Sequence, residues 1–259
     1  MPTLENRLLR SLTVQEHERL APDLQSVPLV MNDLLHEAGD WASFVYFPTS
    51  GVISMLTVLT TGAAVEIATI GNEGMADLSA FFGLRTSPAR LLVQVPGAAI
   101  RMDRGAFDQH LARSAELRAV LGAYSISMFI EVSQTAACNR LHKVEQRCAR
   151  WLLMTHDRVD GALFPITQDF LSEMLGVRRA TVSVAARRLQ EAGILRYRRG
   201  EMEILDRLGL EARSCECYGI IRERFDNLAG GPSVEQRGGR LLSSGRYATD
   251  EEPEAAPQT

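Results

Sequence analysis

Between residues 34 and 101, short apolar runs alternate with glycine and proline. A turn residue such as Gly51, Gly71 or Pro96 separates nearly every neighbouring pair of runs. Runs rich in β-branched and aromatic residues at this spacing are typical of antiparallel strands in a sandwich or jelly roll. The predicted strands span residues 34–36, 44–47, 52–59, 65–70, 91–95 and 99–102.

After residue 106 the pattern changes to a helical period. The run from about 106 to 159 contains no proline, and apolar residues recur along it every three or four positions. A long apolar seam suits a contact between two subunits, so the run predicts a dimerisation helix at 111–142. The alternative is docking on the chain's own β domain, since periodicity does not identify the partner surface. The seam residues are Leu117, Leu121, Tyr124, Met128, Val132 and Ala136.

Two short helical periods joined by a glycine follow within residues 164–200. Thr167 can cap the first helix, and Gly176 ends it. The second period stops at Gly193. Two short helices with a tight turn form the helix-turn-helix unit, whose second helix enters the major groove of DNA. Alternating runs on both sides of residues 199–200 then predict a β-hairpin wing.

This segment is strongly basic in an acidic chain. Residues 178–200 contain seven arginines and one acidic residue, a net charge of +6, whereas the whole chain of 259 residues carries −4. A basic patch on an acidic protein is typical of phosphate binding and predicts an affinity that falls with salt. The alternative, a solvated helix face that binds nothing, is disfavoured because the patch coincides with the helix-turn-helix pattern.

Length and composition fit two packed domains, because 46% hydrophobic and 23% charged residues are ordinary for a globular protein. We expect a cytoplasmic protein, since the sequence shows neither a signal peptide nor a membrane span, and Glu66 interrupts the most apolar stretch, 51–71. Four cysteines are too few and too unevenly placed for a disulfide scaffold. Residues from about Gly230 onward are rich in Gly, Ser, Pro and Glu and are predicted to be disordered.

A β-roll, a long helix and a winged helix-turn-helix in this order resemble the CRP/FNR family of bacterial transcription regulators over roughly residues 34–205. Residues 166–183, ITQDFLSEMLGVRRATVS, are similar to the family pattern ITRQEIGQxxGxSRxTVxR. The resemblance implies an α+β fold with an N-terminal antiparallel β-roll. It also implies a homodimer that binds palindromic double-stranded DNA and acts by contact with, or obstruction of, RNA polymerase. The expected parts are a β-roll effector domain at 1–110, the dimerisation helix at 111–142, the DNA-binding domain with a C-terminal helix at 143–229 and a tail at 230–259.

The resemblance assigns DNA contacts residue by residue. Arg179 matches the arginine that reads a guanine in the family, and its forked guanidinium suits a bidentate bond to O6 and N7. Thr181 matches a threonine expected to touch phosphate. Arg178 stands where a capping serine is usual. Ala180 and Val184 replace base-reading residues of some members, so we expect a different target sequence. The predicted DNA contacts are Thr167, Arg178, Arg179, Thr181, Ser183, Arg187, Arg188, Arg198 and Arg199. The last four are predicted phosphate anchors, and the alternative for each of these four is a solvated side chain without a DNA contact.

The resemblance is weaker at the effector site. Members that bind cyclic nucleotides use a Gly-Glu pair for the ribose and an Arg-Ser or Arg-Thr pair for the cyclic phosphate. Asp77 could replace the glutamate and Arg90 the arginine. Ala76, however, replaces the glycine, and Leu91 removes the hydroxyl. A buried phosphate needs charge-assisted donors, so the residues disfavour a cyclic nucleotide and favour another ligand or none; no cofactor is predicted.

Other chemistries find little support. An iron-sulfur cluster would need about four suitably placed thiolates, and no cysteine precedes Cys138. Cys215 and Cys217 lie in a final helical stretch, where a structural role is favoured over a redox or metal role. A cupin-like metal enzyme needs an HxH pair, which is missing, so we predict no catalytic or metal-ligating residue; the five scattered histidines leave a haem ligand open. The remaining alternative is a small-molecule sensor that acts on a protein partner, which would leave the basic helix unexplained.

Overall fold

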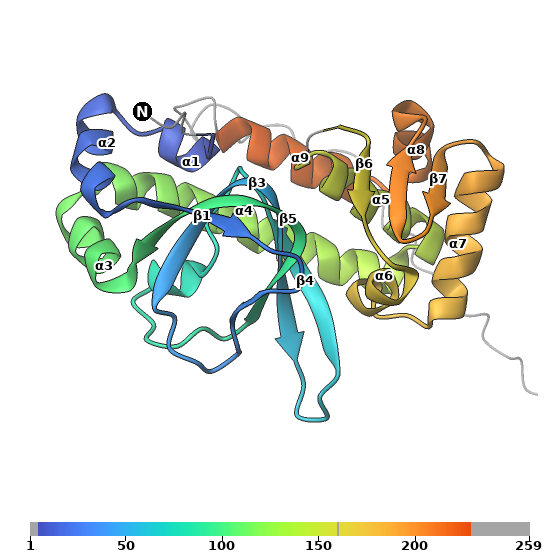
Figure 1. Ribbon diagram of the computed structural model, residues 1–259, viewed down its shortest axis with the longest axis horizontal. Coiled ribbons are helices and arrows are strands. Elements are labelled where there is room, and N and C mark those ends of the chain that lie inside the picture. Colours follow the sequence, from blue (N-terminus) through green and yellow to red (C-terminus); the bar gives the residue numbers. More distant parts are fainter. Residues whose placement is uncertain (1–4, 160, 229–259) are drawn as a thin grey trace, which may run out of the picture. The chain divides into compact units, whose positions relative to one another are not determined.

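The computed structural model describes residues 5–159 and 161–228, so the predicted disordered tail, 230–259, lies outside the described residues. Two short helices precede an antiparallel sheet of five strands in the order β1-β5-β3-β4, with β2 paired to β5 (Figure 1). This sheet confirms the predicted N-terminal antiparallel domain. The elements are α1 (Arg7–Arg10), α2 (Val14–Leu20), β1 (Gln25–Leu29), β2 (Leu34–His36), β3 (Phe44–Val58), β4 (Ala64–Ile70) and β5 (Arg90–Asp103).

Two strands are longer than the sequence predicted. The turns expected near Gly51 and Gly97 are register shifts inside the continuous strands β3 and β5. A Cβ atom at Gly51 would lie 2.6 Å from the carbonyl oxygen of Val95, and one at Gly97 would collide with the backbone of Ser50. Gly51 also has a φ of +80°. The two glycines therefore let the facing strands bend and approach closely without ending.

The predicted helical run consists of three helices, α3 (Arg104–Arg113), α4 (Ala115–Leu141) and α5 (Val144–His156). Ser114 separates the first two because its hydroxyl accepts a hydrogen bond from the backbone N–H of Leu117 at 3.0 Å and so caps α4. The predicted dimerisation helix therefore corresponds to α4.

The predicted seam of α4 faces the interior of its own chain. Leu117, Leu121, Tyr124 and Met128 are at most 4% exposed and belong to the hydrophobic core. Val132 is half-buried and also packs against that core. These residues are already covered within one chain, which leaves them little surface for a second copy, whereas Ala136 is exposed. The apolar residues left open on α4 lie on its other side.

The C-terminal part contains the predicted winged helix-turn-helix. A three-stranded antiparallel sheet, in the order β6-β8-β7, lies against the helices. The last helix, α9, runs back along α4, where the Phe225 ring centroid is 6.2 Å from that of Tyr124 (Figure 1). The elements are β6 (Leu163–Pro165), α6 (Gln168–Leu175), α7 (Arg179–Glu191), β7 (Leu195–Arg198), β8 (Glu201–Ile204), α8 (Arg207–Arg213) and α9 (Cys217–Leu228).

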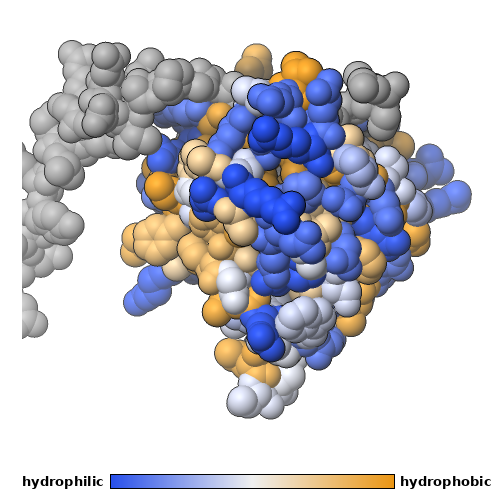
Figure 2. Space-filling model, turned by 90° about the vertical axis from the view of Figure 1, so that its left-hand side faces the viewer, coloured by the Kyte–Doolittle hydropathy of each residue, from blue (hydrophilic) through white to orange (hydrophobic). Residues whose placement is uncertain are grey.

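One hydrophobic cluster continues from the five-stranded sheet through α4 into the helix-turn-helix. The surface near α2 and α3 is mainly hydrophilic, with apolar residues between the polar ones (Figure 2). Across the described ranges, no helix is both long and apolar enough to cross a membrane.

Candidate nucleic-acid interface

Local sequence signals set where α6 begins and ends and where α7 begins. The Thr167 hydroxyl accepts a hydrogen bond from the backbone N–H of Phe170 at 3.1 Å, which caps α6. Gly176 ends the helix with a φ of 62°, a left-handed conformation that glycine adopts without strain. The chain then turns within two residues and begins α7 at Arg179. Both predicted helix boundaries are thus confirmed.

Helix α7 buries one face and leaves the other open. Its buried residues are Val182, Ala185, Ala186 and Leu189, as the helical period predicted. The opposite face carries Ala180, Val184 and Arg187, and its edges carry further polar residues. The open face is therefore free to enter a groove.

The start of α7 has no side-chain cap. Arg178 occupies the capping position, and its side chain makes no capping hydrogen bond. The first N–H groups of a helix lack partners within the helix and carry partial positive charge. Together with exposed Arg178 and Arg179, this end of α7 can receive a phosphate group or an acceptor on a base edge.

Arg179 forms an exposed ion pair with Asp169 of α6. Its Nε atom lies 3.2 Å from Asp169 Oδ1, and the two side chains are 64% and 69% exposed. Exposed pairs contribute only about 0 to 1 kcal/mol. The guanidinium can therefore leave Asp169 for a base at small cost.

Ser183 is held between the two helices. Its hydroxyl lies 2.6 Å from Gln168 Oε1 and 3.1 Å from the Arg179 carbonyl oxygen. An open pocket of about 360 Å³ adjoins this contact. The pocket lies between α7 and the wing and is lined by Gln168, Ser183, Ala186, Arg187, Gln190 and Tyr197.

The wing is the hairpin of β7 and β8, which lies beside α7 (Figure 1). Arg199 and Gly200 both have positive φ, 53° and 85°, as a two-residue type I′ turn requires. Gln190 Oε1 accepts a hydrogen bond from the Tyr197 backbone at 3.0 Å and ties the wing to α7. Arg198 and Arg199 are exposed at the tip and form no ion pair with any described residue.

Arg188 differs from the other predicted phosphate anchors. Its Nη1 atom lies 3.3 Å from Glu145 Oε2 of α5, and Arg213 approaches the same carboxylate at 3.1 Å. Arg188 therefore contributes to packing between helices, and its charge is partly neutralised. Arg187 lines the open pocket instead.

The effector candidates both have partners within the chain. Asp77 is fully buried, accepts a hydrogen bond from Ser79 and lies 3.8 Å from Arg104 Nη1. Arg90 Nε lies 2.8 Å from Glu37 Oε2 at a half-exposed position. Neither candidate lines the open pocket beside α7 or the small cavity under the sheet described next.

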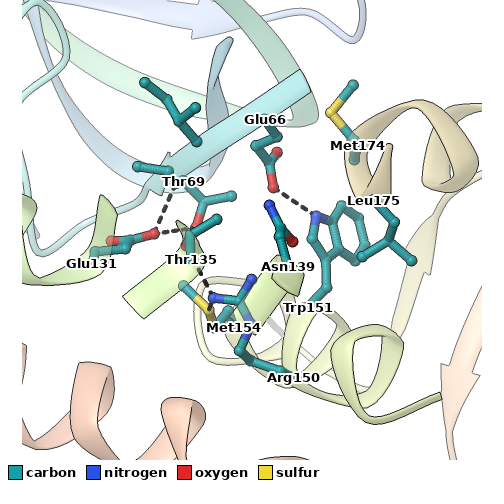
Figure 3. A pocket seen from close by; sticks show the side chains of 12 residues that line it. Glu66, Thr69, Glu131, Thr135, Asn139, Arg150, Trp151, Met154, Met174 and Leu175 are labelled. Carbon is teal, nitrogen blue, oxygen red and sulfur yellow. Dashed lines mark hydrogen bonds between the residues drawn. The ribbon is translucent and has the colours of Figure 1, made fainter. Parts of the chain in front are cut away.

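A small polar cavity lies where the sheet meets the helix-turn-helix (Figure 3). It has a volume of about 10 Å³, room for about one water molecule. Glu66 Oε1 accepts a hydrogen bond from Trp151 Nε1 of α5 at 2.8 Å, and Glu66 Oε2 lies 2.7 Å from Ser54 Oγ. Thr69, Glu131, Thr135, Asn139 and Arg150 also contribute polar groups to the lining. Glu66 is a lone acidic residue inside an apolar strand, and this was the sequence signal for the contact.

Glu66 makes this contact sensitive to pH. Burial raises the pKa of Glu66 to about 7, although hydrogen bonds from Ser54 and Trp151 oppose the rise. The folded protein therefore favours the neutral acid, and this contribution is present at low pH and is lost as pH rises through about 7. We expect Glu66→Gln to gain stability relative to the unsubstituted protein by up to about 3 kcal/mol between pH 5 and pH 8. Urea unfolding at both pH values measures the difference; parallel stability curves would contradict it.

The loop after β4 is held by a buried ion pair with the segment after α5. Arg158 Nη2 lies 2.7 Å from Glu73 Oε1, and both side chains are 6% exposed. Arg158 also donates to the Thr69 hydroxyl, and its carbonyl oxygen accepts a hydrogen bond from Gly51 at 3.2 Å. Burial raises the pKa of Glu73, but attraction and hydrogen bonding by Arg158 outweigh burial and lower it overall. The pair thus connects the sheet to the C-terminal part.

Comparisons with known proteins agree with this geometry. Residues 146–213 match the model of the Crp-like helix-turn-helix domain. Comparison with curated proteins gives no match. Among solved structures, FixK2 from Bradyrhizobium japonicum has a TM-score of 0.61 at 15% identity and covers 74% of this chain and 98% of its own.

Two further structures show the same likeness. A putative transcriptional regulator of the crp/fnr family from Eubacterium rectale has a TM-score of 0.62 at 17% identity, over 79% of this chain and 96% of its own. TTHB099, a CRP family regulator from Thermus thermophilus, has a TM-score of 0.60 at 15% identity, over 73% and 96%. At these identities the likeness concerns the fold.

Proposed function

We propose that the chain is a transcription regulator of the CRP/FNR family, which the Crp-like helix-turn-helix domain at residues 146–213 and the likeness of the fold to solved regulators support. In this proposal it binds a two-fold symmetric DNA site as a homodimer, with α7 of each subunit in the major groove. The observation that carries the proposal is the open, arginine-bearing face of α7 within the matched residues 146–213. Positive charge on a helix-turn-helix supplies affinity for phosphate, and groove contacts supply sequence preference.

We assign the base contact to Arg179. Its guanidinium is exposed, lies at the start of α7 and is held only by an exposed ion pair. Arg178, Thr181 and the wing residues Arg198 and Arg199 are assigned to phosphate, because each is exposed either at the start of α7 or at the wing tip. Thr167 caps α6, and Ser183 joins α7 to Gln168 of α6.

Replacing Arg179 tests the assignment. We expect Arg179→Ala to weaken binding to the preferred site by about 1 to 3 kcal/mol, roughly 5- to 150-fold, and to relax the choice at one base pair in each half-site. Arg179→Lys, which keeps the charge but loses the forked donor, should behave nearly as the alanine variant does. Selection of bound DNA from a random pool, followed by anisotropy titrations, measures both effects.

The matched control is Arg199→Ala at the wing tip. It should weaken preferred and scrambled DNA alike and lower the slope of log affinity against log salt by about one unit per site. If Arg179→Ala behaves in this second way, Arg179 is a phosphate contact and the assignment is wrong.

We place the second subunit of the homodimer on the side of α4 that is exposed to solvent. Ile126 and Phe129 are 49% and 72% exposed there. Phe81 packs near Gly122 on the same side, and its neighbour Phe82 is 61% exposed. Clustered exposed apolar residues mark an interaction surface. A helix presented to its own copy about a two-fold axis gives a self-complementary contact, which sets two α7 helices about one DNA turn apart.

A ligand in the β-roll would control DNA binding only if it bound two conformations of the protein with different affinities. The guanidinium of Arg90 is paired with Glu37, and the carboxylate of Asp77 is buried 3.8 Å from Arg104. This supports a regulator that does not answer to cyclic nucleotides. Contact with RNA polymerase and a place in the bacterial cytoplasm follow from the family role; the alternative is a sensor that acts on a protein partner. We propose no catalytic role.

A further inference from the structure

Four side chains that can bind a metal ion meet where α9 begins. Cys138 lies near the end of α4, and His142 follows it by one helical turn. Cys215 lies between α8 and α9, and Cys217 is the first residue of α9. Their ligand atoms all lie within 4.8 Å of one another. These residues are named the Cys₃His cluster.

The distances in the Cys₃His cluster suit a single tetrahedral ion. The Sγ atoms of Cys138 and Cys215 are 3.5 Å apart, and Cys217 Sγ is 3.6 Å from His142 Nδ1. With zinc–sulfur bonds of about 2.3 Å and zinc–nitrogen bonds of about 2.0 to 2.1 Å, tetrahedral edges are about 3.5 to 3.8 Å. Ligands of a multi-iron cluster bind different irons and lie farther apart, so the spacing favours one ion.

The surroundings complete the arrangement. The three cysteines are at most 3% exposed, whereas the His142 side chain is 17% exposed, so the site lies just below the surface. His142 Nε2 lies 3.3 Å from Glu216 Oε1, while Nδ1 faces the thiols. A carboxylate on the far nitrogen of a ligating histidine fixes its orientation and tautomer, as is usual at zinc sites.

Charge near the cluster is also favourable. Three thiolates, one neutral imidazole and one divalent ion sum to a net charge of about −1, following the usual ionisation of such ligands. Arg147 and Arg150 of α5 are both buried and lie within electrostatic range of Cys138. The two arginines can balance the residual negative charge.

We propose that Cys138, His142, Cys215 and Cys217 bind one zinc ion, which fastens the start of α9 to the end of α4. Soft thiolate and imidazole ligands in a closed four-coordinate set select zinc and form structural sites. The two halves, Cys138-x₃-His142 and Cys215-x-Cys217, are far apart along the chain, which is why no metal ligand was predicted from the sequence. The available signal for a metal site was the short spacing within each half, Cys138-x₃-His142 and Cys215-x-Cys217, taken together.

Zinc content of the purified full-length protein tests the proposal. We expect one zinc ion per chain by elemental mass spectrometry and at most half of that in Cys215→Ser and in Cys217→Ser. Cys148→Ser is the matched control, because Cys148 is equally buried but lies outside the cluster. Cobalt substitution should give the intense absorption of tetrahedral cobalt thiolate in the control and not in Cys217→Ser.

A second measurement needs no variant and covers the case in which a cluster variant fails to fold. In the unsubstituted protein, a chelator should lower the melting temperature and expose three of the four cysteines to a maleimide, with Cys148 still protected. Addition of zinc should restore both. Purified protein that stays metal-free in zinc, or a Cys138–Cys215 disulfide in protein prepared under reducing conditions, would overturn the proposal. Chelator-independent labelling of all four cysteines would do the same.

Discussion

Replacing Ile126 and Phe129 together by aspartate is expected to give a monomer that binds its palindromic site about 100- to 10,000-fold more weakly. Both side chains are exposed on one side of α4, 49% and 72%, and two aspartates there would place charge in the apolar contact between subunits. Loss of the contact removes the gain from binding two half-sites at once. Affinity for a single half-site should stay nearly unchanged.

Light scattering and anisotropy titrations with whole and half sites measure the two effects. Val14→Asp is the control, because Val14 is an equally apolar residue, 75% exposed, on α2. It should leave the protein dimeric. Charge at Leu121 would not be informative, because this residue is fully buried in its own chain and the variant would unfold. A dimer that survives both aspartates would show that the subunits meet elsewhere.

Arg158→Met is expected to destabilise the folded protein by about 3 to 5 kcal/mol, because it leaves the Glu73 carboxylate buried without its partner. Both side chains are 6% exposed, and three segments of the chain meet at Arg158 through Glu73, Thr69 and Gly51. The double variant Arg158→Met with Glu73→Gln removes the buried charge as well. It should recover part of the loss, which a double-mutant cycle in urea measures.

Arg196→Met gives the comparison at an exposed pair. Arg196 binds Glu203 across the wing, and its side chain is 61% exposed, so the loss should stay below about 1 kcal/mol. Equal losses for Arg158→Met and Arg196→Met would mean that the buried pair contributes no more than a surface pair.

The sequence predicted best what depends on neighbouring residues. Thr167, Gly176 and the turn at 199–200 act through their own backbone conformations, so the helix-turn-helix and wing could be placed almost to the residue.

The sequence predicted least where distant segments meet. The period of α4 identified an apolar face, but not that β4 and α9 would cover it within the same chain. Gly51 and Gly97 read as turns because nothing local shows that they face each other across two strands. Glu66 meets Trp151 only after the sheet has packed on α5.

The return of α9 along α4 has a consequence for synthesis. Arg7 donates a hydrogen bond to the Phe225 carbonyl oxygen across 218 positions of sequence, so α1 and α9 touch only when nearly the whole described chain exists. Ribosomes add about 5 to 20 residues per second. The apolar side of α4 therefore stays uncovered for on the order of ten seconds, until α9 has left the ribosome. During that time the nascent chain exposes the apolar residues of α4 that α9 later covers.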